Sequence, residues 1–102
     1  GEAELQAIGQ LEKLEQLDIS RNTFLGPCLA HLARLKLMKR LDLSQTAVTD
    51  EDAQTLLSFS DTLRDVVLTR SRVSPAAVLR LLKSGRDWEI TMVIPMDIPI
   101  VE

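Results

Sequence analysis

The chain's only histidine and only cysteine lie three residues apart, as His31 and Cys28. A thiol and an imidazole at that spacing share one face of a helix, and both are ligand types that zinc prefers. A structural zinc site usually needs four ligands, and the sequence supplies no further cysteine or histidine. We therefore expect no metal site and no cofactor, and we interpret His31 as a structural helix histidine beside a small apolar residue.

Carboxylates and hydroxyls give two further candidates for chemistry. His31, Asp42 and Ser44 are the residue types of a nucleophilic triad, but the pattern places the histidine on a helix and the other two on a strand, across the core. Asp18 and Asp42 align in similar segments, and carboxylates on strands about 4.8 Å apart can raise one pKa. A glycosidase also needs a substrate cleft, so solvated carboxylates are the simpler interpretation. We expect the chain not to be an enzyme.

Composition narrows the class of partner. The sequence has 12 basic and 15 acidic residues, a net charge of −3, and no basic stripe with interleaved aromatic residues, which disfavours nucleic acid. No stretch approaches the roughly 18 apolar residues of a membrane helix, so no membrane partner is expected. A single cysteine and the lack of an Asn-X-Ser/Thr sequon favour an intracellular setting, cytoplasmic or nuclear. A protein partner is the remaining class.

An internal repeat supplies the elements that position these residues. Three similar segments span residues 14–22, 38–46 and 63–71. Their anchors Leu17 and Leu41 are 24 residues apart, Val66 follows after 25, and a degraded fourth copy falls at Ile90. Apolar and polar residues alternate over about three residues in each copy, which predicts a short strand.

The residues between these strands have a helical period. Apolar residues recur every three or four positions in 27–36, 51–59 and 75–83, and residues 1–15 form a further predicted helix. Thr49 and Ser74 are predicted N-caps. The alternation of strand and helix along the chain predicts a layer of parallel strands on one side and a layer of helices on the other. The repeated units must stack on one another, because no single unit can bury its apolar face alone. A compact βαβ sheet is the alternative, but it gives no reason for the strand sequence to repeat.

Segments 17–22 and 41–46 resemble the L-x-L-x-x-N core of the leucine-rich repeat family, and 46–53 resembles its ribonuclease-inhibitor-like or cysteine-containing subtypes. The resemblance covers about residues 11–94. It implies an α/β leucine-rich-repeat solenoid of about three to four repeats with a C-terminal cap, the C-terminal part of a longer array. Asn22, Thr46 and Ser71 occupy the asparagine position, whose side chain bonds loop backbone in that family.

These patterns predict a single leucine-rich-repeat domain over residues 1–102. Its expected parts are an N-terminal helix or truncated repeat (1–15), repeats at 16–37, 38–62 and 63–86, and a degenerate repeat with the C-terminal cap (87–102). Leu43 is expected in the interior between coils, and Trp88 is expected over the open end of the core.

The outward-facing side chains of the strands are the predicted functional surface. They form three columns: Gln16, Arg40, Asp65 and Glu89; Asp18, Asp42, Val67 and Thr91; Ser20, Ser44, Thr69 and Val93. A rigid mixed surface of this kind can bind a protein, with arginine as an anchor. Family resemblance adds that such modules often belong to scaffold or substrate-receptor proteins. The predicted partner-binding residues are Asp18, Arg21, Arg40, Asp42, Asp65, Val67, Arg70 and Thr91.

The apolar tail, residues 93–102, gives the alternative function. Prolines 95 and 99 interrupt it, which suits an edge strand. The tail either caps the solenoid or docks on another chain. A structural cap, or a self-association module acting through the tail or the open ends, is therefore the second hypothesis, with a homo-oligomer as its consequence.

Overall fold

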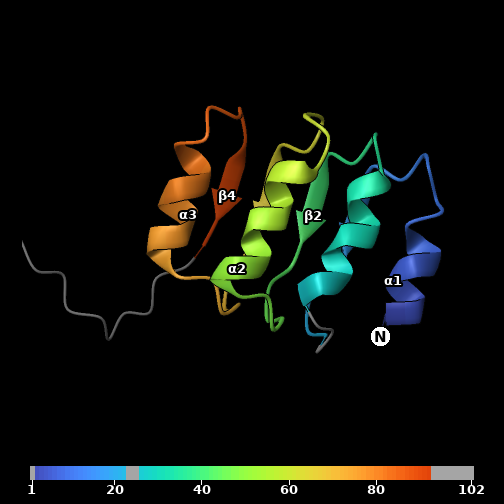
Figure 1. The fold of residues 1–102 in the computed structure, drawn as a ribbon, viewed down its shortest axis with the longest axis horizontal. Coiled ribbons are helices and arrows are strands. Elements are labelled where there is room, and N and C mark those ends of the chain that lie inside the picture. Colours follow the sequence, from blue (N-terminus) through green and yellow to red (C-terminus); the bar gives the residue numbers. More distant parts are fainter. Residues whose placement is uncertain (1, 23–25, 93–102) are drawn as a thin grey trace, which may run out of the picture.

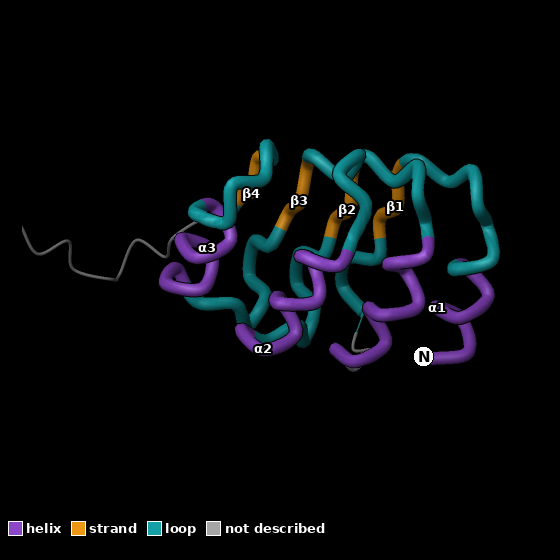
Figure 2. The backbone as a smooth tube through the Cα atoms, turned by 45° about the horizontal axis from the view of Figure 1, so that its top comes forward, coloured by secondary structure: helices purple, strands orange, loops and turns teal. Residues whose placement is uncertain are grey.

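The computed structural model describes residues 2–22 and 26–92. Helical segments form one layer and short strands form the other, so successive units lie side by side along the molecule (Figures 1 and 2). In chain order the elements are α1 (Glu2–Ile8), β1 (Gln16–Asp18), the 3₁₀-helix η1 (Gly26–Arg34), β2 (Arg40–Asp42), α2 (Asp50–Ala53), the 3₁₀-helix η2 (Gln54–Ser58), β3 (Asp65–Val67), α3 (Pro75–Leu82) and β4 (Glu89–Thr91).

The strands form one parallel sheet in the order β1-β2-β3-β4. We call β1 with η1 the first coil, β2 with α2 and η2 the second, and β3 with α3 the third. The central residues Leu17, Leu41, Val66 and Ile90 are direct register partners, as the repeat predicts. The small α/β arrangement of parallel strands and helices is therefore confirmed. The predicted C-terminal cap lies outside the described residues.

The core lies between the strand layer and the helical layer. Leu41, Leu43, Val66 and Leu68 have no exposed surface, and together they connect the second and third coils. Full burial of one such side chain contributes about 1.5–3 kcal/mol. Leu43 is therefore an interior residue, as predicted, and the aliphatic interior is continuous from one coil to the next.

The helical layer is partly 3₁₀ rather than α. Leu29, Leu32 and Leu35 are all fully buried and lie three residues apart in and beside η1. A 3₁₀-helix has 3.0 residues per turn, so that spacing aligns all three on one face. Ala53, Leu56 and Phe59 repeat the same spacing along α2 and η2. The third coil instead uses a regular α-helix, α3, behind an N-cap.

The N-terminal helix is shorter than the sequence pattern predicts. We expected a helix over residues 1–15, but α1 ends at Ile8 and the chain continues in turns. Just after this end, a Cβ added at Gly9 would lie 2.5 Å from the carbonyl oxygen of His31 in η1. The close contact between α1 and η1 therefore depends on a glycine. Leu11, just beyond, stays 53% exposed.

The two predicted N-caps form, and one of them also connects two coils. Thr49 caps α2 in a capping box with Asp52. The Ser74 hydroxyl accepts from the N–H of Ala77 and so caps α3. Both the N–H and the hydroxyl of Ser74 donate to the carboxylate of Asp50, the first residue of α2. The start of α3 is thereby tied to the start of α2.

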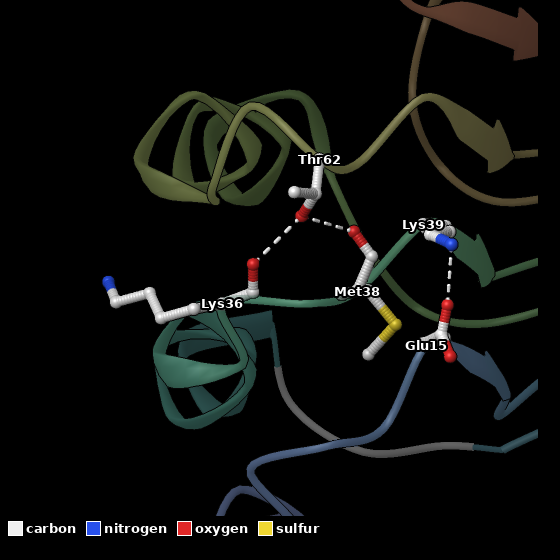
Figure 3. Close-up of polar contacts among 5 residues, drawn as sticks. All are labelled: Glu15, Lys36, Met38, Lys39 and Thr62. Carbon is white, nitrogen blue, oxygen red and sulfur yellow. Dashed lines mark hydrogen bonds and ion pairs between the residues drawn. The ribbon is translucent and has the colours of Figure 1, made fainter.

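Thr62 forms a second polar link between neighbouring coils (Figure 3). Its hydroxyl lies 2.8 Å from the carbonyl oxygen of Met38 and 3.0 Å from that of Lys36. Nearby, Nζ of Lys39 lies 2.6 Å from Oε1 of Glu15, an exposed ion pair between the residues that precede β2 and β1 (Figure 3). The hydroxyl satisfies backbone acceptors where the chain leaves η1, so it fixes the entry of the chain into β2.

Arg86 binds the end of the preceding coil. Its guanidinium donates to carbonyl oxygens at and beyond the end of η2, with Nη1 2.7 Å from the oxygen of Phe59 and 3.3 Å from that of Leu56. Nη2 donates to the carbonyl oxygens of Ser60 and Leu63. The charged guanidinium therefore binds four backbone acceptors in and after η2, and two of them, the carbonyl oxygens of Leu56 and Ser60, also accept backbone N–H groups.

Trp88 completes the same junction. Its side chain is 8% exposed, and Nε1 donates to the carbonyl oxygen of Leu81 at 3.1 Å. The Arg86 guanidinium lies 4.6 Å from the centre of the indole ring, within the range of a cation–π contact. Trp88 therefore packs into the core beside the last strand and ties it to α3, with its polar atom satisfied.

Candidate functional site

The strand side of the molecule brings the predicted columns together. Register pairs Gln16, Arg40, Asp65 and Glu89 in one row across the sheet. The next outward row is Asp18, Asp42, Val67 and Thr91. Neighbouring parallel strands lie about 4.8 Å apart, so these side chains form a continuous surface. The strands are seen together at one side of the tube in Figure 2.

Most of the predicted partner-binding residues are open to solvent. Asp42 and Val67 are half-buried. The other six are exposed: Asp18, Arg21, Arg40, Asp65, Arg70 and Thr91. Of the third column, Ser20, Ser44 and Thr69 are half-buried, and Val93 lies outside the described residues.

Arg21, Gln45 and Arg70 follow the strands at equivalent positions, and each has a left-handed backbone, with φ of 61°, 54° and 58°. This conformation is uncommon for residues other than glycine. In the first two coils the backbone ladder continues into the turn, where Arg21 N–H donates to Ser44 and Gln45 N–H donates to Thr69. The ladder therefore fixes the backbone from which the side chains of Arg21 and Gln45 project.

A side-chain amide or hydroxyl group holds each of these turns, at the equivalent positions Asn22, Thr46 and Ser71. Asn22 Nδ2 donates to the carbonyl oxygen of Ile19 at 2.8 Å. The hydroxyl of Thr46 donates in the same way to Leu43 at 2.6 Å, and that of Ser71 donates to Leu68 at 2.8 Å. Threonine and serine thus replace asparagine without loss of the bond to the residue three positions earlier.

Asp18 and Asp42 also hold their own turns. The N–H and hydroxyl of Ser20 donate to Oδ1 of Asp18 at 2.9 and 2.6 Å, and Ser44 binds Asp42 at 3.0 and 2.7 Å. These hydrogen bonds lower the pKa of Asp18 below its usual 3.8, with the Ser20 hydroxyl as the largest cause. Asp18 is therefore a stable anion, and not the proton donor that a carboxylate pair would require.

The residues considered for catalysis do not meet. His31 belongs to η1 in the helical layer, whereas Asp42 and Ser44 belong to the strand layer, as expected. Within residues 2–22 and 26–92, no group of three or more histidine, cysteine, aspartate or glutamate residues has the arrangement of a metal site. The side chain of Cys28 is not among those described. The described strand surface offers charged and hydrogen-bonding groups.

Sequence reasoning missed Arg64, a residue that lines several hollows of the described surface. Three hollows in the described surface share Arg64, which directly precedes β3. Its side chain is 68% exposed, and Nη1 lies 3.5 Å from a carboxylate oxygen of Asp87. Asp61, Asp65 and Glu89 also line these hollows. An arginine thus stands in an acidic surround at the start of β3 and β4.

A signal for Arg64 does exist in the sequence. Glu15, Lys39 and Arg64 occupy the position before each of the first three strands, one residue ahead of the first outward column. At this position the carbonyl oxygens of Glu15 and Lys39 each accept two N–H groups of the next coil, and that of Arg64 accepts the N–H of Glu89. Glu15, Lys39 and Arg64 are all exposed, whereas the residue before β4 is the buried Trp88.

None of the helices in the described parts of the chain combines the length and the apolar character needed to cross a membrane.

Comparison with known proteins identifies the fold. No family model matches the chain, and no curated protein matches it. Among solved structures, the tropomodulin C-terminal domain from Caenorhabditis elegans is similar, with a TM-score of 0.68 and 19% identity over 89% of this chain. The match covers 61% of that structure's chain, so the present chain spans less than two thirds of its length. The similarity shows a leucine-rich-repeat-like fold.

The closer family assignment is wrong. We expected the ribonuclease-inhibitor-like or cysteine-containing subtype of the leucine-rich repeat family, at the C-terminal part of a longer array. No family model matches, and the similar solved structure is a tropomodulin domain. The physical reason is that the L-x-L-x-x-N pattern fixes only a strand and its turn. The subtype also depends on the structure of the helical side of the repeat. In the first coil this side is a 3₁₀-helix.

Proposed function

We propose that the chain is a non-enzymatic protein-interaction module that binds a protein partner through its strand side. The observation that carries this proposal is the register of the sheet, which places charged and polar side chains from all four strands in straight columns. Their backbone is fixed by the ladder and by the bonded turns. Binding to a preorganised surface loses little conformational entropy, which favours recognition of a folded partner.

The proposed contact residues are the predicted set with two additions. Arginine is enriched among residues that dominate binding energy, so Arg40 at the centre and Arg21 and Arg70 at the turns are the proposed anchors. Asp18 and Asp42 use Oδ1 for their turns and contribute through Oδ2. Asp65, Val67 and Thr91 complete the predicted set. Arg64 and Lys39 extend it to the starts of the strands.

We further propose that residues 1–102 act as one leucine-rich-repeat-like domain with the units given above, ending in a cap. The setting that best fits the composition is cytoplasmic or nuclear, within a larger scaffold or substrate-receptor protein. A small surface of this kind supports an interface near the lower end of the usual ~800 Å² per partner. The proposal that the chain is not an enzyme is consistent with the positions of His31 in the helical layer and of Asp42 and Ser44 in the strand layer.

Paired charge reversals test the proposal. The double variant Arg40→Glu, Arg64→Glu changes the strand side, and the double variant Arg34→Glu, Arg80→Glu changes exposed positions of the helical layer by the same charge. Each chain is immobilised, and proteins captured from cell extract are quantified by mass spectrometry. We expect a set of proteins retained by the wild type and the helical-layer variant and lost by the strand-side variant. Equal capture by all three chains would contradict the proposal.

The alternative is self-association through the tail. It concerns residues 93–102, which lie outside the described residues, and the open end next to them. Light scattering over a concentration series tests it: a tight dimer that is lost on deletion of residues 98–101 would support self-association, and a monomer at every concentration would contradict it.

A further inference from the structure

The strand face is acidic where β3 and β4 begin. These two strands pair with each other at one end of the strand layer (Figure 2). At or just before their first residues lie four exposed carboxylates, which line the hollows around Arg64: Asp61, Asp65, Asp87 and Glu89. In the described chain Arg64 pairs with Asp87, and the other three carboxylates form no ion pair. Lys39, which borders one of these hollows, is paired with Glu15.

The middle and the far end of the same strands carry different groups. Val67 of β3 and Thr69, two residues further on, are half-buried, and Thr91 of β4 is exposed. Beyond them Arg70 is exposed and has a left-handed backbone, and Arg72, also exposed, follows two residues later. Along the direction of β3, the surface therefore changes from acidic, through apolar and hydroxyl groups, to basic.

The β1–β2 half of the strand face does not separate its charges in this way. Arg40 lies at the start of its strand, Asp18 and Asp42 lie in the next row, and Arg21 follows β1. After the hydrogen bonds from Ser20, the charges of Arg40 and Arg21 also lower the pKa of Asp18. Opposite charges in this half therefore lie close enough to offset one another, which leaves the β3–β4 half as the part with separated charge.

Charge complementarity defines the segment that fits this half, because opposite charges across an interface set its orientation. We propose that the partner lays a short segment along β3 and β4, with basic side chains over the carboxylates at the strand starts, an apolar side chain over Val67 and acidic side chains at Arg70. This inference rests on the proposed function, since it names the chemistry of the partner bound by the strand side.

The spacing of the two charged ends favours recognition of charge order. Asp65 and Arg70 are five residues apart, which corresponds to roughly 10–17 Å according to how far the turn is extended. This separation exceeds the ~8 Å over which physiological salt screens exposed charges. Each end therefore acts on the side chains directly above it, and the net charge of the segment matters less than the order of its charges.

A model peptide tests the orientation directly. The probe has six residues, two lysines, a leucine, a threonine and two glutamates in that order, with both ends blocked and a nitroxide label at one end. Broadening of the amide signals of the ¹⁵N-labelled chain shows which residues the label approaches. With the label at the lysine end, we expect the amides of Arg64 and Glu89 to lose at least about twofold more intensity than those of Thr69 and Ser71. With the label at the glutamate end, this order should reverse.

Two charge-reversal variants and a second peptide are the controls. Asp65→Lys with Glu89→Lys changes the strand starts and should abolish the preferred orientation. Glu12→Lys with Glu51→Lys makes the same change of charge at exposed positions outside the strands and should preserve it. A peptide of the same composition with alternating lysine and glutamate should show no preference.

Three results would overturn the proposal: no broadening on the strand face, equal broadening at both ends of the strands, or a preference that persists in the strand-start variant. Failure of this inference can be told apart from failure of the proposed function. If the strand-side variant loses its captured proteins but the peptide shows no preferred orientation, only the inference on charge order fails. If all three chains capture the same proteins, the proposed function fails whatever the peptide shows.

Discussion

The second coil and the last strand are held in place by contacts of different kinds. In the second coil, the interior side chains Leu41 and Leu43 have direct counterparts in the third coil, Val66 and Leu68, and all are fully buried. Its turn is fixed by a hydroxyl of Thr46 that has counterparts in both neighbouring coils. The second coil is therefore stabilised by contacts that recur along the chain.

The last strand depends on contacts that occur once in the described chain. Arg86 binds four carbonyl oxygens at and beyond the end of η2, and Trp88 ties β4 to α3 through the carbonyl of Leu81. These two side chains also stack on each other. The comparison shows that a repeating interior suffices where a coil has neighbours on both sides. At the end of the stack, polar and aromatic contacts take over part of that role.

Removal of one interior side chain tests whether the recurring apolar contacts stabilise the second coil. Leu43→Ala removes buried volume between two coils and should lower the free energy of unfolding by about 2–5 kcal/mol. Urea denaturation followed by circular dichroism measures it. Asp65→Ala, at an exposed position of the next strand, is the control and should change the value by less than ~0.5 kcal/mol. Similar small changes in the free energy of unfolding for both variants would show that Leu43 does not stabilise the interior.

Substitution of Arg86 tests whether its hydrogen bonds hold the last strand in place. Arg86→Leu keeps much of the apolar stem but removes the donors to the carbonyl groups, and we expect a loss of about 1.5–3 kcal/mol. Arg86→Lys keeps the charge without the planar fork and should recover only part of that loss. The same denaturation experiment measures both, with Arg80→Leu on the exposed side of α3 as the control. If Arg86→Lys recovers the full free energy of unfolding, the positive charge alone explains the effect and the planar guanidinium is not needed.

A smaller effect is expected where a cap connects two coils. Ser74→Ala removes the N-cap of α3 and the donors to Asp50, and should cost about 0.5–2 kcal/mol. The hydrogen bonds from Ser74 lower the pKa of Asp50, so the variant should also raise that pKa toward its usual 3.8. NMR titration of the carboxyl carbon measures the second effect. Ser58→Ala, at an exposed position of η2, should change neither quantity.

The smallest effect concerns the turn of the first coil. Because Ser20 lowers the pKa of Asp18 below 3.8, ionised Asp18 stabilises the folded chain above pH 3.8, and this contribution is lost as the pH falls through the folded-state pKa. Ser20→Ala should raise the pKa of Asp18 and reduce this acid dependence. Chemical-shift titration of both chains provides the comparison. An unchanged Asp18 pKa in the variant would show that the hydroxyl of Ser20 does not lower it.

Features that recur could be predicted from the sequence. The 24- and 25-residue intervals place Leu17, Leu41 and Val66 side by side, and the register follows because parallel strands repeat at the same step. The caps at Thr49 and Ser74 were predictable because their residue types act locally. The columns of the candidate surface follow from the same register.

Features that occur once could not be predicted in the same way. The close approach of Gly9 to the backbone of His31 is one such feature, because no local pattern around Gly9 indicates which residue it contacts. Arg86 reaches carbonyl groups 23 to 30 residues away, a contact that no local pattern contains. Asp42 was expected in solvent, but its bond to Ser44 depends on the turn that follows the strand. Arg64 was missed because only the strand residues were considered as surface.

Site-specific photo-crosslinking tests the central claim most directly. A benzophenone amino acid is placed at Gln16 or Thr91 on the strand side, and at Ala30 or Arg80 on the helical layer, all exposed positions. After irradiation in cell extract, the account predicts that the same partner protein is covalently joined to the two strand-side positions and to neither helical-layer position. Adducts of that partner formed only from Ala30 or Arg80 would contradict it.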